Sequence, residues 1–369
     1  MLNRFGTSQL AVAGLLLVGF GLVMVYSASA ARSEVVFGTT LAYLGRQSLA
    51  LALGLCLGAA CFLVPFAFLE KLGLLAWGAS VLALAATFTP LGTSGGGAQR
   101  WLALGPLAFQ PLEPAKLGVL FGLAQWLASH QDRMHDYRTS VLVPGVLAGI
   151  PVLLLLRQPD FGGAMLIAAF TAVLIFAAGA RLGHLLVTGA LVLPLAAAAM
   201  LLRDYRVHRL LAFVDPWADP RGHGYQLVQS QLAFGAGGLL GVGFGAGQQK
   251  LFFLPEAHND FILSVVGEEV GLVGVGLVLI GFAVIALSSL GIAQRAKTPF
   301  ATLVTLGAGL TLWLQAMLNA GVAMGLLPTK GSTLPLVSYG GTSLIASLAS
   351  LGLIANAARP SKRGRAGWR

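Results

Sequence analysis

The sequence is poor in charge. Only 10% of its 369 residues are Asp, Glu, Lys or Arg, whereas 57% are hydrophobic and the mean hydropathy is +0.83. Soluble domains carry roughly 25% charged residues. A soluble fold of this length has no interior large enough for so much apolar surface, which excludes a water-soluble globular protein. The composition therefore predicts a membrane protein with many spans.

Cysteines and metal-binding patterns are also scarce. Cys56 and Cys61 lie five residues apart in one apolar run, which favours packing over a disulfide. The six histidines show no H-E-x-x-H or other metal-ligand spacing, so we predict no metal ligands and no certain cofactor. The glycines of 241–247 match a phosphate-binding pattern outside any strand–helix context, which favours turns or a re-entrant segment.

The net charge of +10 does not predict nucleic-acid binding, because the basic residues are scattered among loops. Five of them occupy the C-terminal segment 359–369, namely Arg359, Lys362, Arg363, Arg365 and Arg369. A short basic tail after a last apolar run is typical of an anchor to anionic lipid headgroups. We therefore expect membrane lipids as partners, and no nucleic acid.

Apolar runs long enough to cross a bilayer of about 30 Å, at about 1.5 Å per residue, occur ten times. Their approximate limits are 8–28, 47–64, 72–89, 114–129, 140–157, 161–180, 183–202, 262–288, 299–321 and 342–358. The short fourth run and the brief gap between the fifth and sixth leave nine or eleven spans open. The first run is longer than a signal-peptide core, so we interpret it as an uncleaved span.

The runs predict an all-α polytopic membrane protein of about ten transmembrane helices. One transmembrane domain covers 1–358, the segment 359–369 forms a basic cytoplasmic tail, and a large extracytoplasmic loop at about 203–261 joins helices 7 and 8. With both termini inside, the short inside segments hold twelve Lys and Arg against six outside, once the long loop is set aside. This difference predicts cytoplasmic termini and an outward-facing loop.

Charged residues near the spans indicate a structural or functional role, because inserting a charged side chain at mid-bilayer costs about 2.5–3.5 kcal/mol of free energy. Glu113 and Lys116 share a helix face, which indicates either a structural ion pair or a cation presented to an anionic ligand. Asp160 is expected to cap the helix that follows it. Glu268 and Glu269 are adjacent, so on a helix they should point about 100° apart and face different surroundings.

The outer loop combines cations with an acidic end, namely Arg203, Arg206, Arg209 and Lys250 with Glu256 and Asp260. A solvated loop of mixed charge is the ordinary interpretation. Cations beside a carboxylate at the mouth of a bilayer also fit an amphiphile with a phosphate headgroup. Arg and Lys would then hold the diphosphate, and a lone carboxylate would take a proton.

The polar segments, in order, resemble one family. They are Arg100-Trp101-Leu102, Gln110 to Lys116, Gly224-Tyr225-Gln226, Leu254 to Phe261, Glu268 to Leu272, and Leu327 to Gly331 followed by Leu334 to Thr342. This set is similar, over nearly the whole chain, to the signature of the SEDS family (shape, elongation, division and sporulation; RodA and FtsW). Leu112, Asn259 and Thr329-Lys330 depart from the common pattern, and none of these departures removes a needed charge.

The resemblance implies ten transmembrane helices and a peptidoglycan glycosyltransferase of the bacterial cytoplasmic membrane. Such an enzyme polymerises lipid II at the outer face and works with a class B penicillin-binding protein. The essential aspartate of the family corresponds to Asp260, which we expect to be the general base. The residues expected to bind substrate are Arg46, Arg100, Glu113, Lys116, Arg209, Lys250 and Ser338. Ser338 lacks a G-x-S-x-G setting and is not predicted as a nucleophile.

Several alternatives stay open at this point. A lipid II flippase would suit the same helix number and charges, although no inverted repeat is evident. A scaffold for other wall enzymes would tolerate substitution of the loop charges. A divalent cation, Mg²⁺ or Mn²⁺, could assist the reaction. The segments Val25 to Ser29 and Gln248 to Lys250 favour the FtsW-like division branch over RodA.

Overall fold

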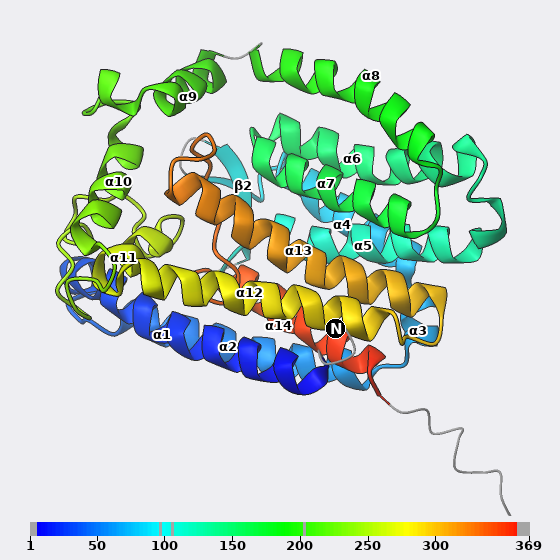
Figure 1. The fold of residues 1–369 in the computed structure, drawn as a ribbon, viewed down its shortest axis with the longest axis horizontal. Coiled ribbons are helices and arrows are strands. Elements are labelled where there is room, and N and C mark those ends of the chain that lie inside the picture. Colours follow the sequence, from blue (N-terminus) through cyan, green and yellow to red (C-terminus); the bar gives the residue numbers. More distant parts are fainter. Residues whose placement is uncertain (1–5, 96–97, 105–106, 202–203, 360–369) are drawn as a thin grey trace, which may run out of the picture.

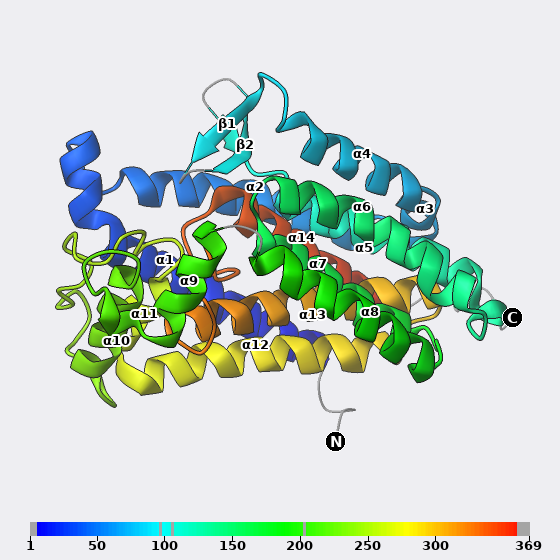
Figure 2. The ribbon, with the colours of Figure 1, turned by 90° about the horizontal axis from the view of Figure 1, so that it is seen from above.

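A computed structural model describes residues 6–95, 98–104, 107–201 and 204–359. Long helices lie side by side in a bundle, and shorter elements lie at both of its ends (Figures 1 and 2). A helix occupies each of the ten predicted spans, which confirms the all-α prediction. The basic tail beyond Arg359 lies outside the described residues.

The helices at the predicted spans overlap the apolar runs, and the first continues to Phe37, nine residues beyond the predicted limit of 28. They are α1 (Thr7–Phe37), α2 (Ala42–Leu63), α4 (Gly73–Ala86), α5 (Leu112–Ser129), α6 (Val143–Arg157), α7 (Phe161–Ala177), α8 (Leu182–Leu201), α11 (Ile262–Glu269) with α12 (Gly271–Ala293), α13 (Pro299–Ala323) and α14 (Gly341–Ala357). Five helical segments in the described part of the chain are long and apolar enough to cross a membrane. Four shorter apolar helices join them, and α5 carries the buried charged residues Glu113 and Lys116.

Short helices connect the spans, namely α3 (Phe66–Lys71), η2 (Gln131–Arg133), η3 (Arg138–Leu142), α9 (Asp204–Val214), η4 (Pro216–Ala218) and α10 (Tyr225–Gly237). The predicted outer loop is therefore largely helical in its first half. In Figures 1 and 2, α9 and α10 lie at one end of the bundle, and α14 ends on the side away from them.

Three short strands were not predicted. β1 (Gly92–Gly95), β2 (Ala98–Leu104) and β3 (Leu107–Phe109) form an antiparallel sheet in the order β1-β2-β3. The sheet connects α4 to α5 (Figure 2). It places Arg100, on β2, at the same end of the bundle as the 158–160 turn.

Close helix packing depends on small residues where α2 meets α14. A Cβ atom on Gly352 would stand 2.1 Å from the carbonyl oxygen of Gly58, so only glycine allows this approach. Small residues at helix contacts are the usual means of association in lipid. By contrast, α8 packs on α7 over a short stretch and exposes apolar side chains along most of its length.

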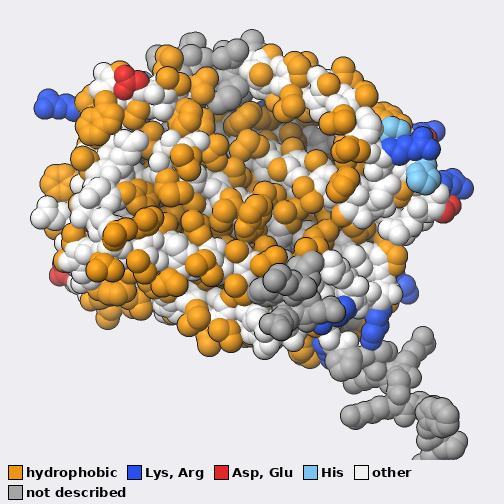
Figure 3. Space-filling model, viewed as in Figure 1, with side chains coloured by type: hydrophobic (Ala, Val, Ile, Leu, Met, Phe, Trp, Pro, Cys, Tyr) orange, Lys and Arg blue, Asp and Glu red, His pale blue; other side chains and the backbone are white. Residues whose placement is uncertain are grey.

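The surface matches a lipid environment. Hydrophobic side chains cover most of the face seen in Figure 3, and Lys and Arg gather mainly at the end opposite α10. Exposed apolar residues on α12, including Leu277 and Ile280, belong to this belt. Apolar side chains therefore fill the interior and also cover the outside of the bundle.

Candidate active site

The backbone of Asp260 is held firmly just before α11 begins. The side-chain amide of Asn319, on α13, donates to the Asp260 carbonyl at 2.8 Å and to the Ser332 carbonyl at 2.6 Å. Because one amide group binds both segments, the 260 and 332 turns keep a fixed relation to each other.

The α13–α14 connection holds the two residues before Asp260. The Ser338 hydroxyl donates to the Asn259 carbonyl at 2.6 Å, and the Tyr339 N–H donates to the His258 carbonyl at 2.9 Å. Ser338 is buried and also accepts from the Leu334 N–H. Its position supports the backbone beside Asp260. This structural role differs from the predicted contact of Ser338 with substrate.

The Asp260 carboxylate makes no hydrogen bond or ion pair within the described segments, and part of its surface stays open to solvent. Burial, the largest cause, and the charge of Glu256 raise its pKa to about 7, while Arg100, Lys330 and Arg209 act in the opposite direction. A carboxyl group that titrates near neutrality and lacks a fixed partner is suited to accept a proton.

Lys330 is the cation that the sequence interpretation did not assign. Its side chain lies against Gly162, where an added Cβ would overlap the lysine chain. Burial lowers the Lys330 pKa to about 8, and the nearby charge of Asp160 opposes that change most strongly. Asp160 accepts from the Gly163 N–H at 2.9 Å and caps α7, which confirms its predicted role.

Two arginines complete the set of cations around Asp260. Arg100 donates to the carbonyls of Gln158 and Pro159, at 3.4 and 2.5 Å, and so connects the sheet to the turn before α7. Arg209, on α9, donates to the Thr329 carbonyl at 3.0 Å. The structure thus brings together two predicted substrate-binding residues, Arg100 and Arg209, with Asp260.

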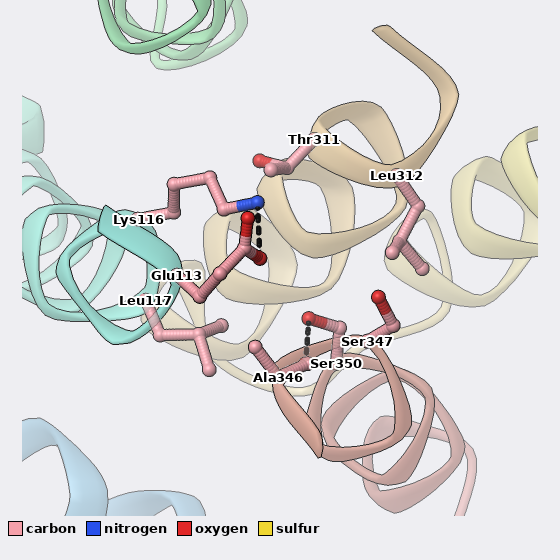
Figure 4. A pocket seen from close by; sticks show the side chains of 8 residues that line it. All are labelled: Glu113, Lys116, Leu117, Thr311, Leu312, Ala346, Ser347 and Ser350. Atoms are coloured by element: carbon pink, nitrogen blue, oxygen red, sulfur yellow. Dashed lines mark hydrogen bonds and ion pairs between the residues drawn. The ribbon is translucent and has the colours of Figure 1, made fainter. Parts of the chain in front are cut away.

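Glu113 and Lys116 lie deeper, inside the bundle. They form an ion pair of 2.7 Å, both are buried, and Lys116 also donates to Gln315 Oε1 at 2.5 Å. A small cavity beside them is lined by Thr311 and Ser347, among others (Figure 4). The geometry favours the ion-pair interpretation over a cation presented directly to a ligand.

Lys250 points into the protein. Its ammonium group contacts Glu269 Oε1 at 2.5 Å, the Ser27 hydroxyl at 2.9 Å and the Gly245 carbonyl at 2.8 Å. These contacts use all three N–H donors of a lysine. The arrangement favours a structural role for Lys250 over the predicted substrate contact.

The side chains of Glu268 and Glu269 both bind the same chain segment, contrary to the expectation that they would face different surroundings. Glu268 accepts from the backbone N–H groups of Gln248 and Gln249, and Glu269 accepts from that of Gly245. Because α11 ends at Glu269, the chain segment 241–250 folds around this helix end and meets both side chains.

Arg46 and Glu256 lie around the aromatic residues next to the site. Arg46 lies over the Phe37 ring, 4.7 Å from its centroid, and beside the Tyr339 hydroxyl. Glu256 pairs with Arg32 at 3.4 Å. The Arg46 guanidinium is not among the cations that influence the pKa of Asp260.

The described residues do not supply a protein-made metal site. They contain no group of three or more His, Cys, Asp or Glu side chains that could hold an ion. We therefore derive no step through a metal, and the suggested assistance by Mg²⁺ or Mn²⁺ stays a prediction.

Sequence reasoning missed Lys330 and assigned no role to Asn319. Lys330 was visible as a charge between two apolar spans, next to Thr329 and Gly331. Its contact with the start of α7 depends on packing between segments far apart in the chain, which spacing alone does not report.

The helical bundle and the cation-surrounded carboxylate at one end of it define a polytopic membrane protein with a titratable site outside its spans. The model of a cell cycle protein family, that of FtsW, RodA and SpoVE, matches residues 8–363. The chain belongs to this family.

Relatives and solved structures cover nearly all of the chain. A probable peptidoglycan glycosyltransferase FtsW of Nitrosococcus halophilus is 44% identical over 348 residues, covering 93% of this chain and 89% of its own. Another from Geobacter sulfurreducens is 38% identical and covers 91% of both chains. A chain from a peptidoglycan synthase complex that coordinates polymerization and crosslinking matches with a TM-score of 0.78 at 35% identity, covering 94% of this chain and 95% of its own. The rod shape determining protein RodA of Thermus thermophilus matches with a TM-score of 0.70 at 32% identity, covering 97% of both chains.

Proposed function

We propose that this protein is a peptidoglycan glycosyltransferase that polymerises lipid II at the outer face of the bacterial cytoplasmic membrane. The observation that carries the proposal is the Asp260 carboxylate, which has no partner among the described residues, is partly open to solvent and lies near Arg100, Arg209 and Lys330. A base beside cations suits a reaction in which a hydroxyl loses a proton and a diphosphate departs. The names of the relatives support the same activity.

In the reaction, a sugar hydroxyl of one lipid-linked disaccharide attacks the anomeric carbon of another. Asp260 takes the hydroxyl proton as the new glycosidic bond forms. The bond between the anomeric carbon and the diphosphate oxygen breaks, and undecaprenyl diphosphate leaves with the electron pair. Lys330 and the two arginines stabilise the negative charge that develops on this leaving group.

Glu113 and Lys116 act on the site indirectly in this proposal. Lys116 binds Gln315, whose amide donates to the Thr333 carbonyl at 3.0 Å. Thr333 lies in the same connection as Lys330. The buried ion pair therefore supports the segment that presents the cation, and it need not contact the substrate.

The proposed orientation places both termini in the cytoplasm. Exposed Lys and Arg gather at the end of the molecule away from α10 (Figure 3), as expected for a cytoplasmic side. Asp260 then lies on the outer side. A class B penicillin-binding protein is the proposed partner, consistent with the synthase complex among the similar structures.

The decisive experiment incubates purified protein with lipid II, with and without the transpeptidase, and separates the glycan products by gel. We expect polymer from the native protein and none from Asp260→Asn, which keeps the size of the side chain. The melting temperature of the variant in detergent checks that it folds. Polymerisation by Asp260→Asn at the native rate would refute the role of Asp260 as the base.

A lipid II flippase remains the competing activity. Vesicles containing the protein and a labelled lipid II distinguish the two, because transport exposes the label at the opposite leaflet without forming polymer. Transport without polymer would support the flippase instead.

Removing divalent cations with EDTA in the polymerisation assay tests the predicted assistance by Mg²⁺ or Mn²⁺.

A further inference from the structure

The segment 238–253, called here the apolar loop, combines exposed apolar side chains with an absence of exposed charge. Its exposed large residues include Leu239, Leu240, Val242, Phe244, Phe252 and Phe253, with Leu240 at 80% and Phe244 at 63% exposure. Lys250 is its only ionisable residue, and that ammonium group is neutralised inside the protein by Glu269. In a solvated loop, the charged side chain is expected to be exposed and the phenylalanines to be buried, which is the opposite of this arrangement.

Part of the backbone of the apolar loop is hydrogen-bonded within the protein. The Val242 and Gly243 N–H groups donate to the carbonyls of Glu268 and Glu269, at 2.9 and 3.0 Å. The Glu268 and Glu269 carboxylates accept from three further N–H groups of the loop, those of Gly245, Gln248 and Gln249. Internal satisfaction of backbone donors is the condition that irregular chain must meet to enter a medium without water.

The apolar loop adjoins an exposed apolar surface of α12. The N–H groups of Leu272 and Val273 donate to the carbonyls of Gly238 and Leu239, at 2.9 and 3.2 Å. Leu272, Val273 and Leu277 are all exposed. The exposed side chains of the loop therefore extend the exposed apolar belt of α12, the surface expected to face lipid.

The depth of the apolar loop also fits. A hydrocarbon core of about 30 Å takes about 20 residues of helix. α12 ends at Ala293, just before the charged residues Arg295 and Lys297. Counting about 20 residues back along the helix from Ala293 reaches about residue 273. The apolar loop is hydrogen-bonded to Leu272 and Val273, so it lies at the boundary between acyl chains and headgroups.

We propose that the apolar loop is an interfacial membrane anchor, whose Leu and Phe side chains insert into the outer leaflet beside α12. Its recognised ligand is the lipid surface. Buried apolar area drives insertion of this kind. The proposal does not depend on the proposed reaction, because it concerns where a surface lies and not what the site catalyses.

The test measures depth with nitroxide labels in the full-length protein. The native cysteines are replaced (Cys56→Ser, Cys61→Ser), and one cysteine is introduced at a time in nanodiscs of phosphatidylethanolamine and phosphatidylglycerol. Leu240→Cys and Phe244→Cys report on the apolar loop. Leu277→Cys is the lipid-facing control, and Arg221→Cys, at an exposed position of the outer segment, is the water-facing control.

We expect labels at 240 and 244 to collide with oxygen, which concentrates in lipid, several-fold more than with a water-soluble nickel chelate, as at 277. A nickel accessibility equal to that at 221 would overturn the proposal. If the labels are open to nickel and become protected only when the transpeptidase is added, the loop is a protein-binding surface and the anchor is refuted. Phe252→Cys gives a second reading if either first variant fails to fold.

Discussion

The backbone of Gly331 lies against the carboxylate of Asp260, where an added Cβ would stand 2.8 Å from Asp260 Oδ2. Gly331 does not have a left-handed φ, so alanine there adds a contact without backbone strain. We expect Gly331→Ala to push the carboxylate from its position and lower kcat for polymerisation about 10–100-fold, because small misplacements of reacting groups are costly. Initial rates with lipid II measure the effect.

A matched glycine controls for this substitution. Gly276, on α12, has open space where a Cβ would stand, so Gly276→Ala should leave both activity and melting temperature unchanged. If Gly331→Ala also polymerises at the native rate, the contact with Asp260 does not limit catalysis.

The rate should depend on pH through two groups. Asp260 must be deprotonated to act as a base, so kcat/KM should rise as pH passes about 7. Lys330 must be protonated to stabilise the diphosphate, so kcat/KM should fall as pH passes about 8. A narrow bell-shaped profile is the expected result of initial rates measured from pH 5 to pH 10.

The variant Lys330→Arg separates the two limbs of this profile. Arginine stays protonated over the whole range, so the fall at high pH should disappear while the rise near neutrality persists. A profile that keeps its alkaline limb in this variant would assign that limb to another group.

The Glu113–Lys116 pair should behave as one unit. Glu113→Gln leaves a buried ammonium without its counter-ion, which we expect to cost about 3–5 kcal/mol in the free energy of unfolding. The double variant Glu113→Gln with Lys116→Met removes both charges and should lose less than Glu113→Gln alone. Unfolding in detergent for the native, two single and double variants gives the coupling, and strictly additive losses would contradict a structural pair.

His258 should make the protein sensitive to mild acid. Burial lowers its pKa to about 4, below the ordinary value of 6.5, so the folded state binds fewer protons than the unfolded state. Its contribution to stability is complete above pH 6.5 and is lost as pH falls toward 4, by about 3 kcal/mol in all. Thermal unfolding at several pH values measures this loss.

Asp260 acts in the opposite direction, because its raised pKa favours the folded state at low pH and the benefit is lost as pH rises to about 7. Comparison with His258→Phe isolates the histidine, since phenylalanine keeps an aromatic ring beside Tyr43 and Tyr339 without titrating. An unchanged difference between the two proteins from pH 7 to pH 4 would exclude His258 as the cause.

The spans and the cap of α7 could be predicted because they depend on local pattern. Apolar runs of sufficient length specify membrane helices regardless of their neighbours. Asp160 precedes its helix as an N-cap residue does, and the bond to Gly163 requires only local geometry.

The sheet and the charge pairings could not be predicted in the same way. The segment 92–97 is Gly, Thr and Ser with no alternation of apolar residues, so nothing in it indicates a strand. The pairing of Lys250 with Glu269 depends on how the chain folds around the end of α11. The Lys330 side chain packs against Gly162, where any larger residue would overlap it. Sequence spacing does not report such a tertiary contact.

The helix α11 joins two features at its opposite ends. Asp260 lies two residues before its first residue, Ile262, and the carboxylates of Glu268 and Glu269 at its last turn hold the apolar loop. Eight helical residues extend about 12 Å. The protein thus contains a built-in gauge. If the apolar loop enters the leaflet as proposed, one short helix fixes the distance between that leaflet and the carboxylate proposed as the base, so bilayer thickness and lipid composition become variables of the reaction.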